Sequence, residues 1–140
     1  MENSIKFSTD YPLAILVAEP FLESGSSARD ILTQLGYQPE LATNSREMLN
    51  MTSQKSYDVV LMDIRMPEAE NILASHLTDT ESRRPIFIAM TVSGRTNFRE
   101  MHLSEGMDHA ISKPVDRAEL ALQLKACSVL TGIRRIRPTG

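Results

Sequence analysis

The chain has 140 residues, with 15 lysines and arginines against 18 aspartates and glutamates, which gives a formal net charge of −3. This length is that of a single domain, and the charge balance excludes a nucleic-acid binder that works through a general basic field, although it leaves room for a local basic patch. The single cysteine excludes a disulfide framework, and the lack of a long apolar run or of a signal-peptide core predicts a cytoplasmic domain without membrane contact.

Short apolar segments alternate along the chain with segments of helical periodicity. Residues 13–18 are apolar on both faces, and so are residues 59–63 and 85–91 apart from their last residues, Asp63 and Thr91. This pattern indicates strands that are buried between two layers. A weaker strand is expected at residues 39–43 and a short last strand at residues 110–112. Five parallel strands are therefore predicted.

Apolar residues at spacings of three and four predict a helix after each of these strands. The apolar residues that predict these helices lie in the ranges 22–35, 48–51, 72–77, 98–103 and 120–129. Alternation of strands and helices predicts an α/β fold with a parallel sheet that is covered on both faces. We expect residues 1–10 to be an N-terminal linker, 11–130 the folded domain and 131–140 a C-terminal tail.

Polar residues stand where four of the predicted strands end. Glu19 follows the first strand, Asp63 ends the third, Thr91 ends the fourth and Lys113 follows the fifth. The carboxyl ends of parallel strands meet at one edge of the sheet, so we expect these side chains to converge. This set of residues favours phosphoryl transfer to a carboxylate nucleophile. Mg²⁺, a lysine and a hydroxyl would stabilise the oxygens of the phosphoryl group.

Four stretches of the sequence carry a resemblance to a known family: ILVAE (15–19), YDVVLMDIRMP (57–67), PIFIAMT (85–91) and GMDHAISKPV (106–115). In this order they resemble the receiver domain of two-component response regulators, and most of all the receivers of hybrid histidine kinases. The resemblance implies a flavodoxin-like, doubly wound five-stranded sheet of strand order 2-1-3-4-5 with five helices.

The resemblance also implies roles for individual residues. Asp63 would be the phosphoacceptor, Lys113 would pair with it, and Thr91 would follow the phosphoryl oxygens. Glu19, Asp63 and the backbone carbonyl of Arg65 would hold Mg²⁺. The phosphoryl group would come from a histidine kinase or a histidine-phosphotransfer domain, so that the domain is not itself an enzyme. A homodimer through the fourth helix, fifth strand and fifth helix is a further possibility.

Three positions depart from the family pattern, and all three concern activity. Pro20 stands where the family has a second acid after the first strand, which predicts a weak or absent Mg²⁺ site because Mg²⁺ needs oxygen ligands. Ala110 replaces the aromatic residue of the family's switch, and Val92 replaces a very small residue after the threonine. These departures predict a receiver with impaired activity.

Other interpretations remain open. The domain could be a pseudo-receiver that acts only as a phosphorylation-independent interaction module. An aspartate-nucleophile phosphatase is disfavoured because Arg65 stands where such enzymes have a second acid, and a nucleotide-binding domain lacks its Gly-rich loop. Asp58 is expected to be structural, because strand alternation places it on the face opposite Asp63, and Cys127 is expected in the core.

Overall fold

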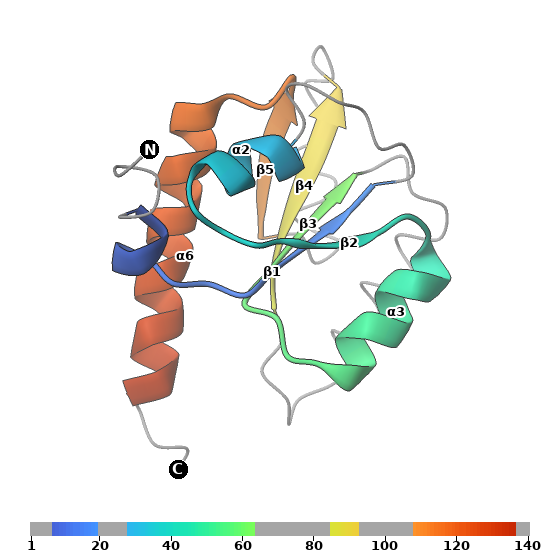
Figure 1. Ribbon diagram of the computed structural model, residues 1–140, viewed down its shortest axis with the longest axis horizontal. Coiled ribbons are helices and arrows are strands. Elements are labelled where there is room, and N and C mark those ends of the chain that lie inside the picture. Colours follow the sequence, from blue (N-terminus) through green and yellow to red (C-terminus); the bar gives the residue numbers. More distant parts are fainter. Residues whose placement is uncertain (1–6, 20–27, 64–84, 93–107, 137–140) are drawn as a thin grey trace.

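The computed structural model describes residues 7–19, 28–63, 85–92 and 108–136. Its centre is a five-stranded sheet of order β2-β1-β3-β4-β5 in which all neighbouring strands are parallel (Figure 1). The strands are β1 (Ile15–Ala18), β2 (Glu40–Ala42), β3 (Val59–Asp63), β4 (Ile86–Val92) and β5 (His109–Lys113). The helices are α2 (Ala28–Gln34), α3 (Ser45–Gln54) and α6 (Arg117–Ile136). The predicted strand order and α/β architecture are confirmed.

Helices cover both faces of the sheet, as the two-sided apolar strands require. Alternate residues of β1 point to opposite faces: Val17 packs with residues of α2 and α6, whereas Leu16 packs with Met48 of α3. Figure 1 shows α2 and α6 on one side of the sheet and α3 on the other. Cys127 is buried on the α6 side, as expected. Two of the five expected helices, at residues 72–77 and 98–103, lie outside the described residues.

Local signals in the sequence define the helix ends. Gly36, at φ 98°, follows α2, and the Tyr37 amide donates to the Leu32 carbonyl, a backbone turn that favours glycine. Asn44 caps α3 by accepting a hydrogen bond from the Glu47 amide at 2.8 Å. An aspartate before α6 makes the same type of cap. These ends orient the helices that frame the sheet.

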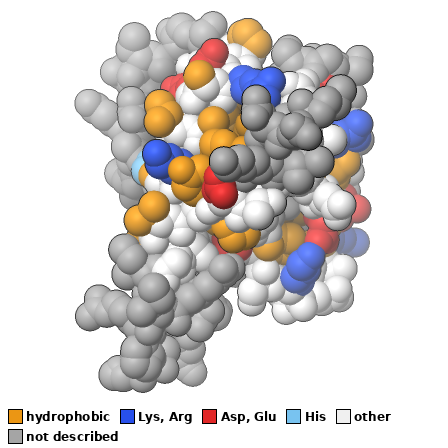
Figure 2. All heavy atoms as spheres, turned by 60° about the vertical axis from the view of Figure 1, so that its left-hand side comes forward, with side chains coloured by type: hydrophobic (Ala, Val, Ile, Leu, Met, Phe, Trp, Pro, Cys, Tyr) orange, Lys and Arg blue, Asp and Glu red, His pale blue; other side chains and the backbone are white. Residues whose placement is uncertain are grey.

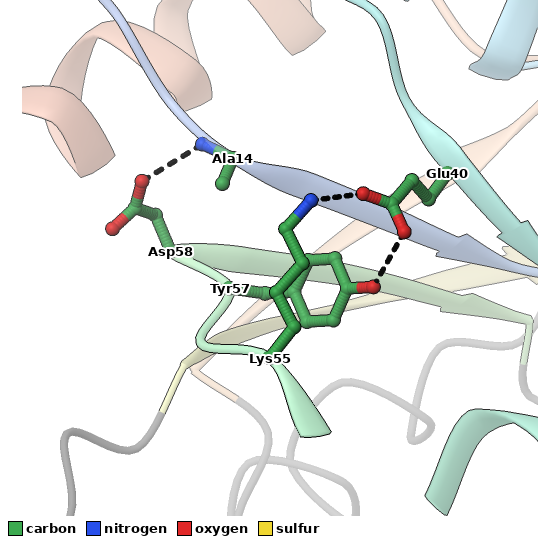
Figure 3. A network of polar contacts seen from close by, with 5 residues as sticks. All are labelled: Ala14, Glu40, Lys55, Tyr57 and Asp58. Carbon is green, nitrogen blue, oxygen red and sulfur yellow. Dashed lines mark hydrogen bonds and ion pairs between the residues drawn. The ribbon is translucent and has the colours of Figure 1, made fainter. Parts of the chain in front are cut away.

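Two aspartates fasten neighbouring strands at the amino edge of the sheet. Asp58, just before β3, accepts a hydrogen bond through Oδ2 from the Ala14 amide at 2.8 Å, which confirms its expected structural role (Figure 3). Asp108, just before β5, accepts one from the Phe87 amide at 2.9 Å. Each carboxylate satisfies an amide near the start of a strand, where an unpaired donor would be costly.

A polar network holds the edge strand β2 against the start of β3. Glu40 in β2 pairs with the Lys55 ammonium through Oε2 and accepts a hydrogen bond from the Tyr57 hydroxyl through Oε1 at 2.8 Å (Figure 3). The hydrogen bond from Lys55, followed by that from Tyr57, lowers the pKa of Glu40. Burial, followed by the bond to Glu40, raises the pKa of Tyr57 to about 12. The network thus links β2 to the segment that precedes β3, although β1 lies between these two strands in the sheet.

Ordered structure extends beyond the expected domain limits of residues 11 and 130. Residues 7–10 form a helical turn, and Phe7 packs on the core beside Tyr11 and Tyr37, with ring centroids 4.9 and 6.3 Å away. The Tyr37 hydroxyl donates to the Tyr11 carbonyl at 2.5 Å. At the other end, α6 continues to Ile136. Among the described residues, no helix is both long and apolar enough to cross a membrane.

Candidate functional site

The carboxyl edge of the sheet brings together three of the predicted site residues. Glu19 directly follows β1, Asp63 is the last residue of β3, and Lys113 is the last residue of β5. The strand registers place Glu19 and Asp63 at one level, because each follows a residue of the Ala18–Met62 pair. Lys113 lies two residues further along its strand, because Asp63 pairs with Met90 and Met90 pairs with Ile111. The strand-end rule therefore located these residues correctly.

Lys113 and Asp63 form a direct ion pair across the end of β4, which lies between their strands. The Lys113 Nζ donates to Asp63 Oδ2 at 2.7 Å, although the two residues are 50 positions apart in the chain. The Asp63 side chain is 1% exposed and that of Lys113 is 18% exposed. The flexible stem of lysine lets its ammonium reach past one strand to a carboxylate on the next.

Glu19 completes a cluster of three charges. Its side chain is buried, and Oε1 lies 3.7 Å from Lys113 Nζ, which is ion-pair distance but too long for a hydrogen bond. The Glu19 amide donates to the Ala42 carbonyl at 3.0 Å, which fixes the backbone at this point. One cation thus lies between two buried carboxylates, and Asp63 is the nearer of the two.

This arrangement suits a reaction at a carboxylate oxygen. An ionised aspartate is a nucleophile, and the ammonium beside it can stabilise negative charge that develops on an incoming group. Two carboxylates and one ammonium leave the cluster with a net negative charge, which favours a cation. Buried carboxylates that face the same point are also the ligands that a hard divalent cation prefers.

The donor set fits Mg²⁺ with two carboxylates, those of Glu19 and Asp63. Mg²⁺ sites in proteins use one or two carboxylates and fill the remaining positions with water or other oxygens, so this pair is sufficient. Among the described residues, no group of three or more histidine, cysteine, aspartate or glutamate side chains could hold a metal.

The remaining predicted site residues are placed only in part. Thr91 lies in β4 with its backbone in register with Ser112, at the same edge of the sheet, and its side chain lies outside the described part. Arg65 and Pro20 also lie outside the described residues, as does the side chain of Val92. Ala110 is in β5, opposite Ala89, and packs against the core on the α3 side. A small residue therefore occupies the position expected for the switch aromatic.

One structural feature of this sheet escaped the sequence reasoning. Asp108 fastens β5 to β4 in the way that Asp58 fastens β3 to β1. The signal was present, since an aspartate directly precedes the β3 segment in Tyr57-Asp58 and the β5 segment in Met107-Asp108. These bonds position the strands whose far ends carry Asp63 and Lys113.

Comparison with known proteins identifies the fold and the family. The chain matches the response regulator receiver domain over residues 15–125. It is 32% identical over 130 residues to Histidine protein kinase 1 of Candida albicans, covering 84% of this chain and 5% of that protein. It is 33% identical over 123 residues to Hybrid signal transduction histidine kinase H of Dictyostelium discoideum, covering 82% and 9%. The chain therefore spans less than a tenth of the length of these two relatives.

The solved structures that this chain resembles include receiver domains as well. The receiver domain of sensor histidine kinase PA1611 from Pseudomonas aeruginosa, with a magnesium ion in its active site cleft, is 27% identical with a TM-score of 0.72, covering 84% of this chain and 98% of that one. The Saccharomyces cerevisiae Ssk1 receiver domain, solved with the phosphotransfer protein Ypd1, shares the fold at 16% identity and a TM-score of 0.72, covering 85% and 90%. The chain belongs to the receiver domain family of two-component response regulators, and its relatives include the receivers of hybrid histidine kinases.

Proposed function

We propose that Asp63 accepts a phosphoryl group from a phosphohistidine of a histidine kinase or a histidine-phosphotransfer domain. The observation that carries this proposal is the buried Asp63 carboxylate at the end of β3, hydrogen-bonded to the Lys113 ammonium at 2.7 Å. A carboxylate at this position of the family fold, with a lysine beside it, has the nucleophile and the counter-charge in place.

The transfer step follows from these groups. An Asp63 carboxylate oxygen attacks phosphorus, and the bond between phosphorus and the donor histidine nitrogen breaks with its electron pair returning to the imidazole. The product is an acyl phosphate on Asp63. The Lys113 ammonium can move from the attacking carboxylate to the phosphoryl oxygens and there stabilise their negative charge. Preorganised charge of this kind is often the largest contribution to phosphoryl transfer.

Mg²⁺ is the cofactor that the family fold implies, and Glu19 and Asp63 would hold it with the backbone carbonyl of Arg65. When bound, the ion neutralises charge on the phosphoryl oxygens. Pro20 removes one carboxylate that the family normally supplies, so we propose that binding is weaker than in receivers with the full acidic set. Apart from Asp63, Glu19 would then contribute most of the affinity for Mg²⁺.

A phosphotransfer domain is the proposed partner. The structure of the Ssk1 receiver with Ypd1 supports it, because it shows that this fold can engage a histidine phosphotransfer protein. The hybrid kinases among the relatives support the same source of the phosphoryl group within a longer chain. In either case the histidine must approach the carboxyl edge of the sheet, where Asp63 lies.

The test is the phosphorylation of the isolated protein by a small phosphodonor such as acetyl phosphate in millimolar Mg²⁺. Intact-mass spectrometry is expected to show the gain of one phosphoryl group in the native protein and none in Asp63→Asn. A Glu19→Gln variant is the matched comparison for the metal, and we expect it to be phosphorylated more slowly at each Mg²⁺ concentration. A gain that is equal in Asp63→Asn, or no gain in the native protein, overturns the proposal.

A second function is favoured by a specific observation. Proline and alanine stand at positions 20 and 110, where the family has its second acid and its switch aromatic, and Ala110 is partly buried against the core on the α3 side. A domain with these changes can serve as a docking module whose partner binds without phosphorylation. A native protein that takes up no phosphoryl group but binds a phosphotransfer domain as tightly as its Asp63→Asn variant would establish this alternative.

A further inference from the structure

Two aspartates bind the neighbouring strand in the same way. Asp108 makes two hydrogen bonds with Phe87: its amide donates to the Phe87 carbonyl at 2.9 Å, and its Oδ2 accepts from the Phe87 amide at 2.9 Å. Asp58 makes the same two bonds with Ala14, each at 2.8 Å. We call such a pair of bonds a reciprocal clamp. It fixes two residues opposite each other, because both bonds lengthen when either strand slides.

Each reciprocal clamp lies at the same distance from a member of the ion pair. Asp108 directly precedes β5, and Lys113 ends that strand five residues later. Asp58 directly precedes β3, and Asp63 ends that strand five residues later. Residues an odd number of positions apart in a strand point to opposite faces, so the clamp side chains do not reach the site themselves. Any effect of a clamp on the site must therefore act through the backbone of its strand.

The strand β3 has other interactions that determine its alignment. It lies between β1 and β4 and pairs with both, so that two hydrogen-bond ladders hold it. All five of its residues are buried, and a slip would displace every one of these side chains from its place in the core. The position of Asp63 is therefore secured independently of the clamp at Asp58.

The strand β5 has far fewer such interactions. It is the last strand of the described sheet, with β4 as its neighbour, and Ile111 is its only buried residue. A strand with so little apolar burial specifies its register weakly. A slip of one residue would turn Lys113 to the other face of the sheet, and a slip of two would move it by roughly 6–7 Å along the strand. The clamp at Asp108 opposes both movements.

The contact between Lys113 and Asp63 is short and depends on such alignment. Lys113 Nζ lies 2.7 Å from Asp63 Oδ2, and the Asp63 side chain is 1% exposed. On the face shown in Figure 2, the basic and acidic side chains of the described part are scattered among hydrophobic and neutral ones and do not gather by sign. Local contact, rather than a patch of like charge on that face, is thus what brings the ammonium to the carboxylate.

We propose that Asp108 is a positioning residue for Lys113: its reciprocal clamp on Phe87 sets the register of β5, and this register places the Lys113 ammonium on Asp63. Asp58 makes the same clamp but lacks this role, because β3 is held on both sides. The consequence for phosphoryl transfer rests on the proposed function of Asp63, since displacement of a preorganised charge slows the reaction that it assists.

Four variants separate positioning from stability. Asp108→Ala removes the oxygen of the clamp, whereas Asp108→Asn keeps an oxygen that can accept from the Phe87 amide. Asp58→Ala is the matched control, because it removes the same type of bond from a strand that does not carry Lys113. Circular dichroism checks the fold of each variant. Asp108→Glu, which displaces the carboxylate by one methylene, takes the place of Asp108→Ala if the alanine variant does not fold.

The first experiment follows the Lys113 ammonium itself by ¹⁵N–¹H NMR, with the signal assigned from its loss in Lys113→Arg. We expect Asp108→Ala to shift this signal towards those of the exposed lysines, and Asp108→Asn and Asp58→Ala to leave it near its native position. No shift in Asp108→Ala, or an equal shift in Asp58→Ala, overturns the proposal. This measurement needs neither Mg²⁺ nor a phosphodonor.

The second experiment measures the rate of phosphorylation by acetyl phosphate at a fixed Mg²⁺ concentration. We expect Asp108→Ala to react about tenfold more slowly than the native protein, and Asp108→Asn and Asp58→Ala to stay within about twofold of it. An unchanged rate in Asp108→Ala, or an equal loss in Asp58→Ala, contradicts a role in the transfer. If the native protein takes up no phosphoryl group, the proposed function fails, and the ammonium signal alone decides whether Asp108 positions Lys113.

Discussion

Lys113 Nζ lies 2.7 Å from Asp63 Oδ2 and 3.7 Å from Glu19 Oε1, so one ammonium serves two buried carboxylates. The three residues come from the ends of three different strands. Because the carboxylates outnumber the ammonium, we expect the charge of Lys113 to contribute to the stability of this end of the sheet as well as to the proposed chemistry. This double role makes the site testable through stability.

Removal of the lysine is expected to destabilise the fold. Lys113→Met leaves two buried carboxylates without their cation and should lower the free energy of unfolding by about 3–5 kcal/mol. The double variant with Asp63→Asn should recover part of this loss, because one of the two unpaired buried carboxylates is then removed. Urea denaturation measures both variants, with Lys125→Met as the surface control. A double variant that is no more stable than Lys113→Met alone would contradict the pairing.

Restoring the missing acid is expected to strengthen Mg²⁺ binding. Pro20→Asp adds a carboxylate next to Glu19 and should tighten Mg²⁺ binding by roughly tenfold. Isothermal titration calorimetry measures the affinity directly. Pro20→Asn is the matched control, since it has nearly the same size without the charge. Equal affinities of these two variants would show that the missing acid is not the cause of a weak site.

The network of Glu40, Lys55 and Tyr57 predicts that the free energy of unfolding falls as the solution becomes acidic. The hydrogen bonds from Lys55 and Tyr57 hold the pKa of Glu40 below its ordinary value. The stabilisation is therefore present above the ordinary pKa of a glutamate and is lost as the pH falls through the lowered pKa of the folded state. Because Glu40 is partly exposed, the effect is expected to be under about 1 kcal/mol.

Urea denaturation at a series of pH values from neutral to acidic measures this loss of stability. The Lys55→Met variant should be less stable than the native protein at neutral pH and should lose less stability on acidification. Arg46→Met, an exposed change on α3, serves as the control. Parallel pH profiles of the native protein and Lys55→Met would be inconsistent with a role for the pair.

The strand-fastening aspartate makes a separate prediction. Asp58→Ala leaves the Ala14 amide without the oxygen that it now contacts at 2.8 Å, and should cost about 1–3 kcal/mol of stability. Asp58→Asn should cost less, because its amide oxygen can still accept. Thermal and urea unfolding measure both. If the two variants lose the same stability, the charge of Asp58 matters rather than this hydrogen bond.

Much of the sheet could be predicted because buried parallel strands have a strong signal. The VVLMD segment coincides with β3, and the site residues Glu19, Asp63 and Lys113 follow from the rule that parallel strands end at one edge. The last strand was expected at residues 110–112 and spans His109–Lys113. Its ends are polar or charged, so backbone pairing with β4, rather than an apolar run, determines its length.

Contacts between distant segments could not be predicted in this way. The partner of Asp58 is Ala14, 44 residues away, and the partner of Glu40 is Lys55, so both depend on the register and spacing of strands. Leu122 and Val129 were expected in the last helix, but apolarity alone did not reveal that they face outward. Spacing relative to the buried Leu120 and Leu124 supplies that information only once the inner face is known.

The central claim is that Asp63 is the phosphoacceptor, and locating the phosphoryl group tests it most directly. After treatment with acetyl phosphate and Mg²⁺, borohydride reduction converts an aspartyl phosphate to homoserine, and peptide mass spectrometry identifies the modified residue. We predict homoserine at position 63 in the native protein and at no position in Asp63→Asn. Unmodified Asp63 after this treatment, or modification of another residue alone, would contradict the account.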